Sequence, residues 1–309
     1  MSRRTKFSTL FGISIGALVV IVGILLALHT FEAGRAFTVR SYVRAERAWN
    51  NHSPDAGGKG LFRRAEPSLV RAGLLNPVRV EVDPDVSLLL DPGDDVARTI
   101  LISRAGRWEP EVWAAISSGL SPGAVFFDVG AHTAYDSLKA SRVVGDQGRV
   151  VAFEPNPNTL SALRSNIAAS RSQNVIVQPI ACTDVEQMLA LFDSTPGGNS
   201  SSSSLSEANA GERSPSDTVK GRPIDAVVAE TGLTRLDVLK ADVEGAELLV
   251  LRGATETLRR FHPKLILEVV PRQLENMNTS VEELEPFIRS HGDHAVRVVD
   301  YKNREYTAR

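Results

Sequence analysis

The second half of the chain alternates between two hydrophobic patterns. Short apolar runs that are typical of buried strands alternate with segments whose apolar residues recur at helical spacing. The predicted strands lie at 124–129, 149–155, 174–181, 187–193, 236–243, 263–270 and 295–299, and the predicted helices at 134–144, 157–170, 246–260 and 281–292. Strands separated by helices of about 10–15 residues indicate parallel crossover units. The sequence therefore predicts an α/β fold with a doubly wound, mostly parallel sheet.

The segment before this alternation has a different pattern. Residues 78–90 predict a β-hairpin, because two strand-like runs flank a turn at 83–86. Two helices are expected at 95–106 and 109–120. Residues 53–60 are rich in Gly, Pro and Asp and predict a linker. The folded domain is therefore expected to begin near residue 61.

An apolar stretch occupies residues 10–28 near the N-terminus. No charged residue occurs between Lys6 and Glu32, and a run of this length can cross a bilayer core as a helix. A cleaved secretory signal is the alternative, but the run exceeds the about 7–15 apolar residues of such signals. We therefore expect a transmembrane helix at 10–29 that anchors the protein as a single span. Basic residues flank the stretch on both sides, so its orientation is left open.

The composition excludes several classes of function. The net charge is −2, so no general basic surface indicates a nucleic-acid partner. The one cysteine, Cys182, excludes an intramolecular disulfide and is expected to be a buried packing residue. The six histidines show no metal-ligand spacing with cysteine or acidic residues, so no metal site is expected. The oligomeric state is left open.

Residues 194–221 are rich in Ser, Gly and Pro and contain hardly any large apolar side chain. Such a segment buries too little surface to order itself, so a mobile loop is expected. A lid that closes on substrate is the functional alternative.

Polar residues and glycine stand where predicted strands give way to helices. In FFDVGAH (126–132), Asp128 ends a strand and Gly130 permits a tight turn, and in VVAFEP (150–155), Glu154 ends the next strand. The carboxyl ends of parallel strands converge on one crevice, where ligands bind. An acid at the position of Glu154 can accept hydrogen bonds from both hydroxyls of a ribose. Because the G-x-G-x-x-G spacing is missing, the pattern favours a nucleotide-type cofactor other than NAD or FAD.

A third strand end, LKADVEGAE (239–247), carries three acidic residues, Asp242, Glu244 and Glu247. Acids at the start of a helix stabilise its dipole, but three exceed what capping requires. A carboxylate at this place can hold a cofactor amine or take a proton from a substrate hydroxyl. The sequence leaves open which acid has which role.

Together, FFDVGAH, AFEP, LKADVEGAE with the following RGA (252–254), and PKLILEV resemble the FkbM-type S-adenosylmethionine-dependent methyltransferases over roughly residues 78–300. The resemblance implies a class I methyltransferase fold, with a seven-stranded sheet whose last strand is antiparallel. It also implies that Asp128, Gly130 and His132 line the methionine side of the cofactor, that Glu154 holds the ribose, and that Asp242 lies near the methyl donor. This chain departs from the family pattern at Ala134, where family members usually carry glycine.

The resemblance predicts S-adenosylmethionine as the cofactor and O-methylation of a sugar, glycan or other small-molecule hydroxyl. A hydroxyl nucleophile benefits from a general base. Glu244 is the first candidate for this base, with Asp242, Glu268 and His132 as alternatives. Because S-adenosylmethionine is kept in the cytosol, the catalytic domain of a membrane-anchored enzyme is expected to be cytoplasmic.

Two other functions are alternatives. The chain could be a membrane-tethered scaffold with an inactive methyltransferase fold, or an NAD-dependent oxidoreductase, which the glycine pattern opposes. The expected domains are a basic tail at 1–9, the transmembrane helix at 10–29, a juxtamembrane segment and linker at 30–60, the hairpin and helices at 61–123, and the cofactor-binding core at 124–309.

Overall fold

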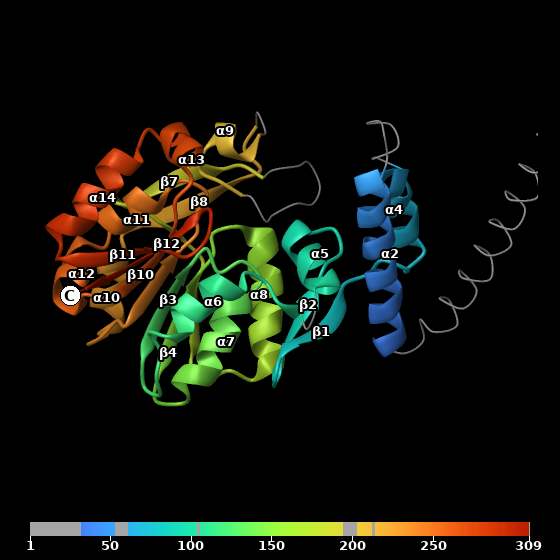
Figure 1. Cartoon of the computed structure of the whole chain (residues 1–309), viewed down its shortest axis with the longest axis horizontal. Helices are drawn as coiled ribbons and strands as arrows, with labels where there is room; N and C mark the ends of the chain where they lie inside the picture. Colours follow the sequence, from blue (N-terminus) through green and yellow to red (C-terminus); the bar gives the residue numbers. More distant parts are fainter. Residues whose placement is uncertain (1–31, 53–60, 104–105, 194–202, 212–213, 309) are drawn as a thin grey trace, which may run out of the picture.

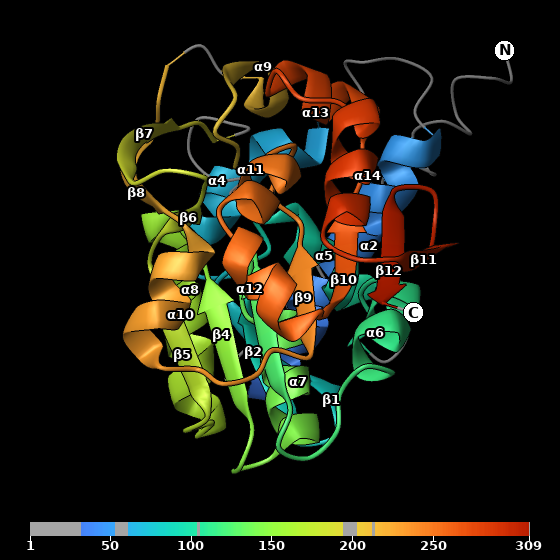
Figure 2. The ribbon, with the colours of Figure 1, turned by 90° about the vertical axis from the view of Figure 1, so that its left-hand side faces the viewer.

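The computed structural model describes residues 32–52, 61–103, 106–193, 203–211 and 214–308. A seven-stranded sheet lies at the centre, with helices on both of its faces (Figures 1 and 2). The strands follow the order β11–β12–β10–β9–β3–β4–β5. Their bounds are β3 Val125–Val129, β4 Arg149–Phe153, β5 Val175–Gln178, β9 Val238–Ala241, β10 Lys264–Glu268, β11 His294–Val298 and β12 Asn303–Ala308.

Five neighbouring strands of this sheet are parallel. β3 pairs with β4 and β9, β4 pairs with β5, and β9 pairs with β10, all in parallel. β12 then pairs antiparallel with both β10 and β11. This topology confirms the predicted doubly wound, mostly parallel sheet of seven strands with an antiparallel last strand.

Alternate residues of each central strand enter different cores, as the pleat of a strand requires. Phe127 packs in the core under α10, α11, α12 and α14, whereas its neighbour Phe126 packs in the core under α6 and α7. All five residues of β3 are buried, because helices cover both faces. The bounds of these helices are α6 Pro110–Ser117, α7 Tyr135–Val144, α8 Pro157–Ser170, α10 Ile224–Thr231, α11 Glu247–Arg252, α12 Thr255–Phe261 and α14 Val281–Ser290.

The predicted helix at 246–260 is divided into α11 and α12 around Gly253. A Cβ at Gly253 would lie 2.1 Å from the carbonyl oxygen of Thr183, so only glycine permits this close approach. The break therefore comes from a tertiary contact, which the hydrophobic spacing does not reveal.

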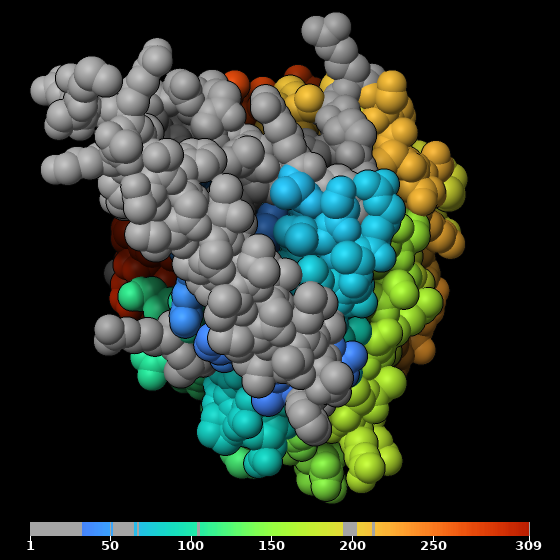
Figure 3. All heavy atoms as spheres, turned by 90° about the vertical axis from the view of Figure 1, so that its right-hand side faces the viewer, coloured from blue at the N-terminus to red at the C-terminus, as the bar shows by residue number. Residues whose placement is uncertain are grey.

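The hairpin predicted at 78–90 forms from β1 (Val78–Asp83) and β2 (Val86–Leu90), which pair antiparallel. It shares a hydrophobic core with α2 (Glu32–His52), α5 (Asp95–Ile102), α7 and α8. Asn166 of α8 fastens the hairpin, because its side-chain oxygen accepts a hydrogen bond of 2.7 Å from the backbone N–H of Leu89. Figure 3 shows this side of the molecule, with α4 (Leu61–Arg71) in light blue above the hairpin.

A small second sheet stands beside the carboxyl ends of the central strands. Its order is β6 (Ala181–Cys182), β8 (Asp217–Arg222) and β7 (Gln187–Leu191). Two short helices, α9 (Glu207–Ala210) and α13 (Pro271–Asn276), lie near each other at the same end of the molecule (Figures 1 and 2). Both α9 and β8 belong to the Ser-rich segment 194–221, so its described part contains regular secondary structure.

The expectations about a membrane are corrected. Within the described ranges, each helix is too short or too polar to cross a bilayer. α2 has 21 residues, but arginine and glutamate side chains recur along it, and such side chains are costly in hydrocarbon. The span predicted at 10–29 lies outside the described residues. The described part of the fold therefore contains no membrane-spanning helix, and the predicted single-pass localisation with a cytoplasmic domain is withdrawn.

Candidate active site

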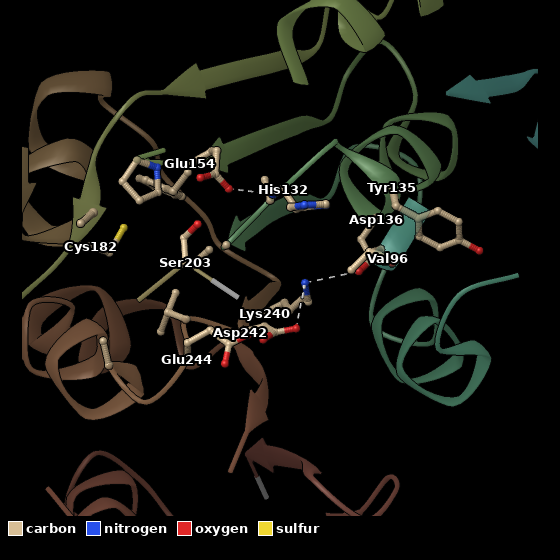
Figure 4. A pocket seen from close by; sticks show the side chains of 18 of the residues that line it. Val96, His132, Tyr135, Asp136, Glu154, Cys182, Ser203, Lys240, Asp242 and Glu244 are labelled. Atoms are coloured by element: carbon tan, nitrogen blue, oxygen red, sulfur yellow. Dashed lines mark hydrogen bonds and ion pairs between the residues drawn. The ribbon is translucent and has the colours of Figure 1, made fainter. Parts of the chain in front are cut away.

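A cavity of about 340 Å³ opens at the carboxyl ends of the parallel strands. Its volume lies within the about 300–1,000 Å³ that is usual for small-molecule sites. The turn after β3, the ends of β4 and β9, and the turn between β11 and β12 all contribute to its wall (Figure 4). The site residues predicted from the sequence that line it are Gly130, His132, Glu154, Asp242 and Glu244.

The turn after β3 requires glycine at position 130. Gly130 has a φ of +85°, and a Cβ there would lie 2.0 Å from the backbone carbonyl oxygen of Asp242. The backbone N–H of Gly130 donates to the carbonyl of Phe153, and the N–H of Asp242 donates to that of Val129. Gly130 thus allows the ends of β3, β4 and β9 to approach one another closely.

His132 is fixed between two carboxylates. Its backbone N–H donates a hydrogen bond of 2.9 Å to Glu154 Oε2, and its Nε2 lies 3.2 Å from Asp94 Oδ2. Burial disfavours the charged imidazole, but Asp94 and Glu154 outweigh this effect and raise the pKa of His132. Because carboxylates engage both its backbone N–H and its ring, the position of His132 favours a structural role over that of a general base.

Ala134, where the family pattern has glycine, does not line the cavity. It adopts a φ of +74° at the start of α7, is fully buried, and packs in the core of the hairpin. Its methyl group therefore contacts that core, and crowding of a cofactor by this methyl group is not expected from the geometry.

Glu154 directly follows β4 and is 94% buried. Oε2 accepts the N–H of His132 and Oε1 accepts the N–H of Asn156, both at 2.9 Å. Burial raises the pKa of Glu154, while the hydrogen bonds and His132 oppose that rise. Since each carboxylate oxygen can accept a second bond, the side chain can still receive two hydroxyl donors from the cavity.

Asp128 does not reach the cavity surface. It is fully buried, and its Oδ2 accepts a hydrogen bond of 2.5 Å from Ser137 Oγ at the start of α7. Its other partner is the ammonium of Lys240, at 3.6 Å. The structure thus places Asp128 beneath the residues that line the cavity, where it supports them.

Lys240 is a cavity residue that the sequence reasoning missed. Its Nζ lies 3.5 Å from Asp136, 3.6 Å from Asp128 and 3.8 Å from Asp242 (Figure 4). Burial disfavours its charge, but these carboxylates outweigh that effect and raise its pKa. The sequence does contain a sign of this role, because Lys240 is the one charged residue of the strand VLKA (238–241). Lysine is rarely buried in a strand unless it is paired with acidic groups.

Three carboxylates gather on one side of the site, where Asp242 and Glu244 line the cavity and the buried Glu268 lies next to them. Asp242, Glu244 and Glu268 each place an oxygen within 4.8 Å of the others. Burial, followed by the charge of Asp242, raises the pKa of Glu244 to about 8. The same two causes raise the pKa of Glu268 to about 8, although Lys302 opposes them. The charged forms of these two carboxyl groups are therefore disfavoured at this place.

Lys302, from the turn between β11 and β12, is the second cation that the sequence reasoning missed. Its Nζ lies 2.5 Å from Glu268 Oε1 and 3.4 Å from Glu109. Gln273 of α13 donates its side-chain N–H to Glu244 Oε2.

Glu247, the third acid of the LKADVEGAE segment, has a structural role. Its Oε1 accepts hydrogen bonds from the backbone N–H groups of Val243 and Gly245 at the start of α11.

Residues 203–209 pass over the acidic side of the cavity. Ser203 and Leu205 line the cavity, and both Ser204 Oγ and Asn209 Nδ2 donate to the carbonyl oxygen of Glu244. Asn156 Nδ2 donates to Ser203 Oγ at 2.8 Å. These bonds connect the described end of the Ser-rich segment to two strand ends of the site.

Cys182 also lines the cavity, yet it is 96% buried. Burial raises the pKa of its thiol, so very little thiolate forms near neutral pH. We expect iodoacetamide at pH 8 to modify native Cys182 at least about 100-fold more slowly than the urea-unfolded chain, as mass spectrometry can measure. Equal rates in the two states would show that the thiol is exposed.

A family model described as the methyltransferase FkbM domain matches residues 128–295, which is more than half of the chain. This range includes the predicted site residues that line the cavity, which are Gly130, His132, Glu154, Asp242 and Glu244. The chain belongs to the FkbM methyltransferase family. This confirms the resemblance seen in the sequence and places the chain in a family of methyltransferases. The FkbM assignment also supports S-adenosylmethionine as the predicted cofactor.

Individual relatives of this FkbM protein match only in part. The AMB antimetabolite synthetase AmbE of Pseudomonas aeruginosa is 30% identical over 59% of this chain, which spans about 10% of the synthetase's length. The crystal structure of methyltransferase FkbM from Methylobacillus flagellatus KT has 16% identity and a TM-score of 0.43, covering 79% of this chain and 58% of that one. The fibrillarin of Aeropyrum pernix, solved with natively bound S-adenosyl-L-methionine, has 13% identity and a TM-score of 0.36, covering 63% and 75%.

Proposed function

We propose that this protein transfers the methyl group of S-adenosylmethionine to a hydroxyl oxygen of a sugar, a glycan or another small molecule. The observation that carries the proposal is the single cavity at the strand ends, which has Glu154 on one side and the carboxylates of Asp242 and Glu244 on the other (Figure 4). Membership of the family supports methyl transfer as the reaction. The cavity contains groups that can bind a cofactor and groups that can bind an alcohol.

The residues of the cavity fit the adenosyl part of this cofactor. Glu154 has one accepting position left on each oxygen, which suits the two hydroxyls of a ribose. Gly130 leaves the floor free of a side chain. Val129, Phe153 and Ile180 give the wall an apolar portion, as a purine ring requires. The sulfonium group, when bound, supplies the electrophilic methyl carbon.

The acidic residues fit the positive charge and the acceptor. Asp136 and Asp242 face the cavity and share the ammonium of Lys240, so this side carries net negative charge that favours a cationic donor. Displacement at a methyl carbon gains most of its rate from the alignment of nucleophile, carbon and leaving group. We propose that Glu244, which Gln273 holds in the cavity wall, takes the proton of the acceptor hydroxyl.

Calorimetry on the full chain tests the cofactor part of the proposal. S-adenosylmethionine is expected to bind with one site per chain, and NADH is expected to give no heat of binding. Binding of NADH alone would favour an oxidoreductase, and binding of neither would favour a scaffold without a cofactor.

Glu154→Gln is expected to weaken binding of S-adenosylmethionine by about 10- to 100-fold, because hydrogen bonds to a charged group contribute about 1.5–3 kcal/mol. The side-chain NH₂ group of the new glutamine would face a backbone N–H, which can destabilise the fold. The melting temperature of the variant is therefore measured as well. Glu111→Gln, at an exposed position of α6, is the matched control and should bind as the wild type does. Unchanged affinity of a folded Glu154→Gln protein would remove the ribose role.

A further inference from the structure

The acidic side of the cavity contains more carboxylates than the proposed proton transfer needs. Asp242, Glu244 and Glu268 converge from the ends of two adjacent parallel strands, β9 and β10, and each places an oxygen within 4.8 Å of the others. One proton acceptor would require one of them. The charged forms of three carboxyl groups at this distance repel one another, so they are favoured together only beside a compensating positive charge.

Lys302 compensates only part of this charge. Its ammonium contacts Glu268 Oε1 and also Glu109, which is a fourth carboxylate. Asp242 has its nearest cation, Lys240, at 3.8 Å, and that ammonium is shared with two further aspartates. Two lysines therefore face a larger number of carboxylates around the same space.

A second observation points to a missing partner at the same place. Glu268 is 97% buried, and its Oε2 has no hydrogen-bond donor, while its Oε1 is held by Lys302. A buried carboxylate oxygen without a donor is costly and calls for an explanation such as an ion. Glu244 differs from it, since Gln273 already donates to one of its oxygens.

We propose that Asp242, Glu244 and Glu268 bind a hard divalent cation of the Mg²⁺ or Mn²⁺ type on the acceptor side of the cavity. Carboxylate oxygens are the ligands that such cations prefer, and Mg²⁺ is commonly held by one or two of them while water and substrate oxygens complete the shell. In an octahedral shell with metal–oxygen distances of about 2.1 Å, neighbouring ligands lie about 3.0 Å apart and opposite ligands about 4.2 Å apart, so the three carboxylates draw closer together when they share one ion. Lys302 orients Glu268 from outside the coordination shell.

The cation deepens the proposed function and rests on it, because it explains how a weakly acidic alcohol becomes a nucleophile. Positive charge beside the acceptor oxygen facilitates loss of its proton. The O–H bond breaks and the proton passes to Glu244, the oxygen forms a bond to the methyl carbon, and the carbon–sulfur bond breaks with its electron pair left on sulfur. The products are a methyl ether and S-adenosylhomocysteine, and the cation is unchanged.

The expectation that the chain has no metal site was based on histidine spacing alone. Carboxylates 24 residues or more apart in sequence give no such spacing signal; Asp242 and Glu268 meet only because β9 and β10 are neighbours in the sheet. The cluster is the one group of this kind among the residues that the structure describes.

Binding of Mn²⁺ to the full chain after EDTA treatment and desalting tests the proposal, with electron paramagnetic resonance reporting the free ion. Wild type is expected to bind one Mn²⁺ that Mg²⁺ displaces. Glu268→Gln is expected to weaken this binding at least about 10-fold. Asp242→Asn is expected to have the same effect and replaces Glu268→Gln in the test if that variant does not fold. The matched control is Glu282→Gln at an exposed position of α14, which should bind Mn²⁺ as wild type does.

Binding of S-adenosylmethionine to the EDTA-treated chain separates the two proposals. Cofactor binding without saturable Mn²⁺ binding, or equal Mn²⁺ affinity in wild type and Glu268→Gln, overturns the cation site and leaves the methyltransferase proposal in place. Absence of cofactor binding with or without Mn²⁺ overturns the proposed function itself. Cofactor binding together with a Mn²⁺ site that Glu268→Gln weakens supports both.

Discussion

Glu244→Gln is expected to lower methyl transfer by about 10²- to 10⁴-fold while the affinity for S-adenosylmethionine stays near that of the wild type. The amide keeps the shape of the side chain but accepts no proton from the acceptor. Glu244 lies on the acidic side of the cavity, whereas the groups proposed for the ribose lie on the other side, so binding should be spared. Turnover is measured as release of S-adenosylhomocysteine with a hydroxyl-bearing acceptor found by screening sugars against the wild type.

The control for this variant is Glu207→Gln, which makes the same chemical change at an exposed position of α9. Its turnover should equal that of the wild type. If Glu244→Gln retains turnover within a few-fold of the wild type, another group takes the proton and the assignment to Glu244 is wrong.

Gly130→Ala is expected to destabilise the fold by about 2–5 kcal/mol and to abolish measurable cofactor binding. The added methyl group would lie 2.0 Å from the backbone carbonyl of Asp242, and the backbone would also retain a φ of +85°. Overpacking costs about 1–3 kcal/mol and the left-handed conformation about 1–2 kcal/mol more. The free energy of unfolding in urea and calorimetry with S-adenosylmethionine measure the two effects.

Gly123→Ala separates strain from collision. Gly123 has a φ of +84°, almost the same as that of Gly130, but a Cβ there meets no atom within 4 Å. Its substitution should therefore cost only the about 1–2 kcal/mol of the left-handed conformation and leave cofactor binding intact. Similar losses in the two variants would show that contact with Asp242 does not determine the role of Gly130.

The central strands were predictable because their signal is local. The apolar runs that contain β3, β4, β9 and β10 are continuous, since helices cover both faces of the sheet. β12 was missed, because NREYTA has few apolar residues and its partners β10 and β11 precede it in the chain. Tyr306 of β12 is buried only when the strand has paired in the sheet, so its place in the core cannot be predicted from the local sequence.

The candidate site divides in the same way. Gly130, Glu154 and Asp242 follow directly from strand ends, and the structure brings them to one cavity. Lys302 comes from a turn far along the chain, and its approach to Glu268 depends on the antiparallel pairing of β10 and β12. The sequence also placed Asp128 in the cavity wall, because strand-end position does not reveal whether a neighbour such as Ser137 covers the carboxylate.

Three non-glycine residues with a left-handed backbone lie in the turns that follow β3 and β9. His132, Ala134 and Glu244 have φ values of +48°, +74° and +53°. Each such residue costs about 1–2 kcal/mol relative to a relaxed backbone. A laboratory selection for heat resistance alone would therefore favour glycine or asparagine at these positions. At His132 and Glu244 such a substitution would stabilise the fold but remove a side chain from the cavity. A higher melting temperature and the proposed methyl transfer would then place opposite demands on these two positions, whereas Ala134 has no polar group to lose.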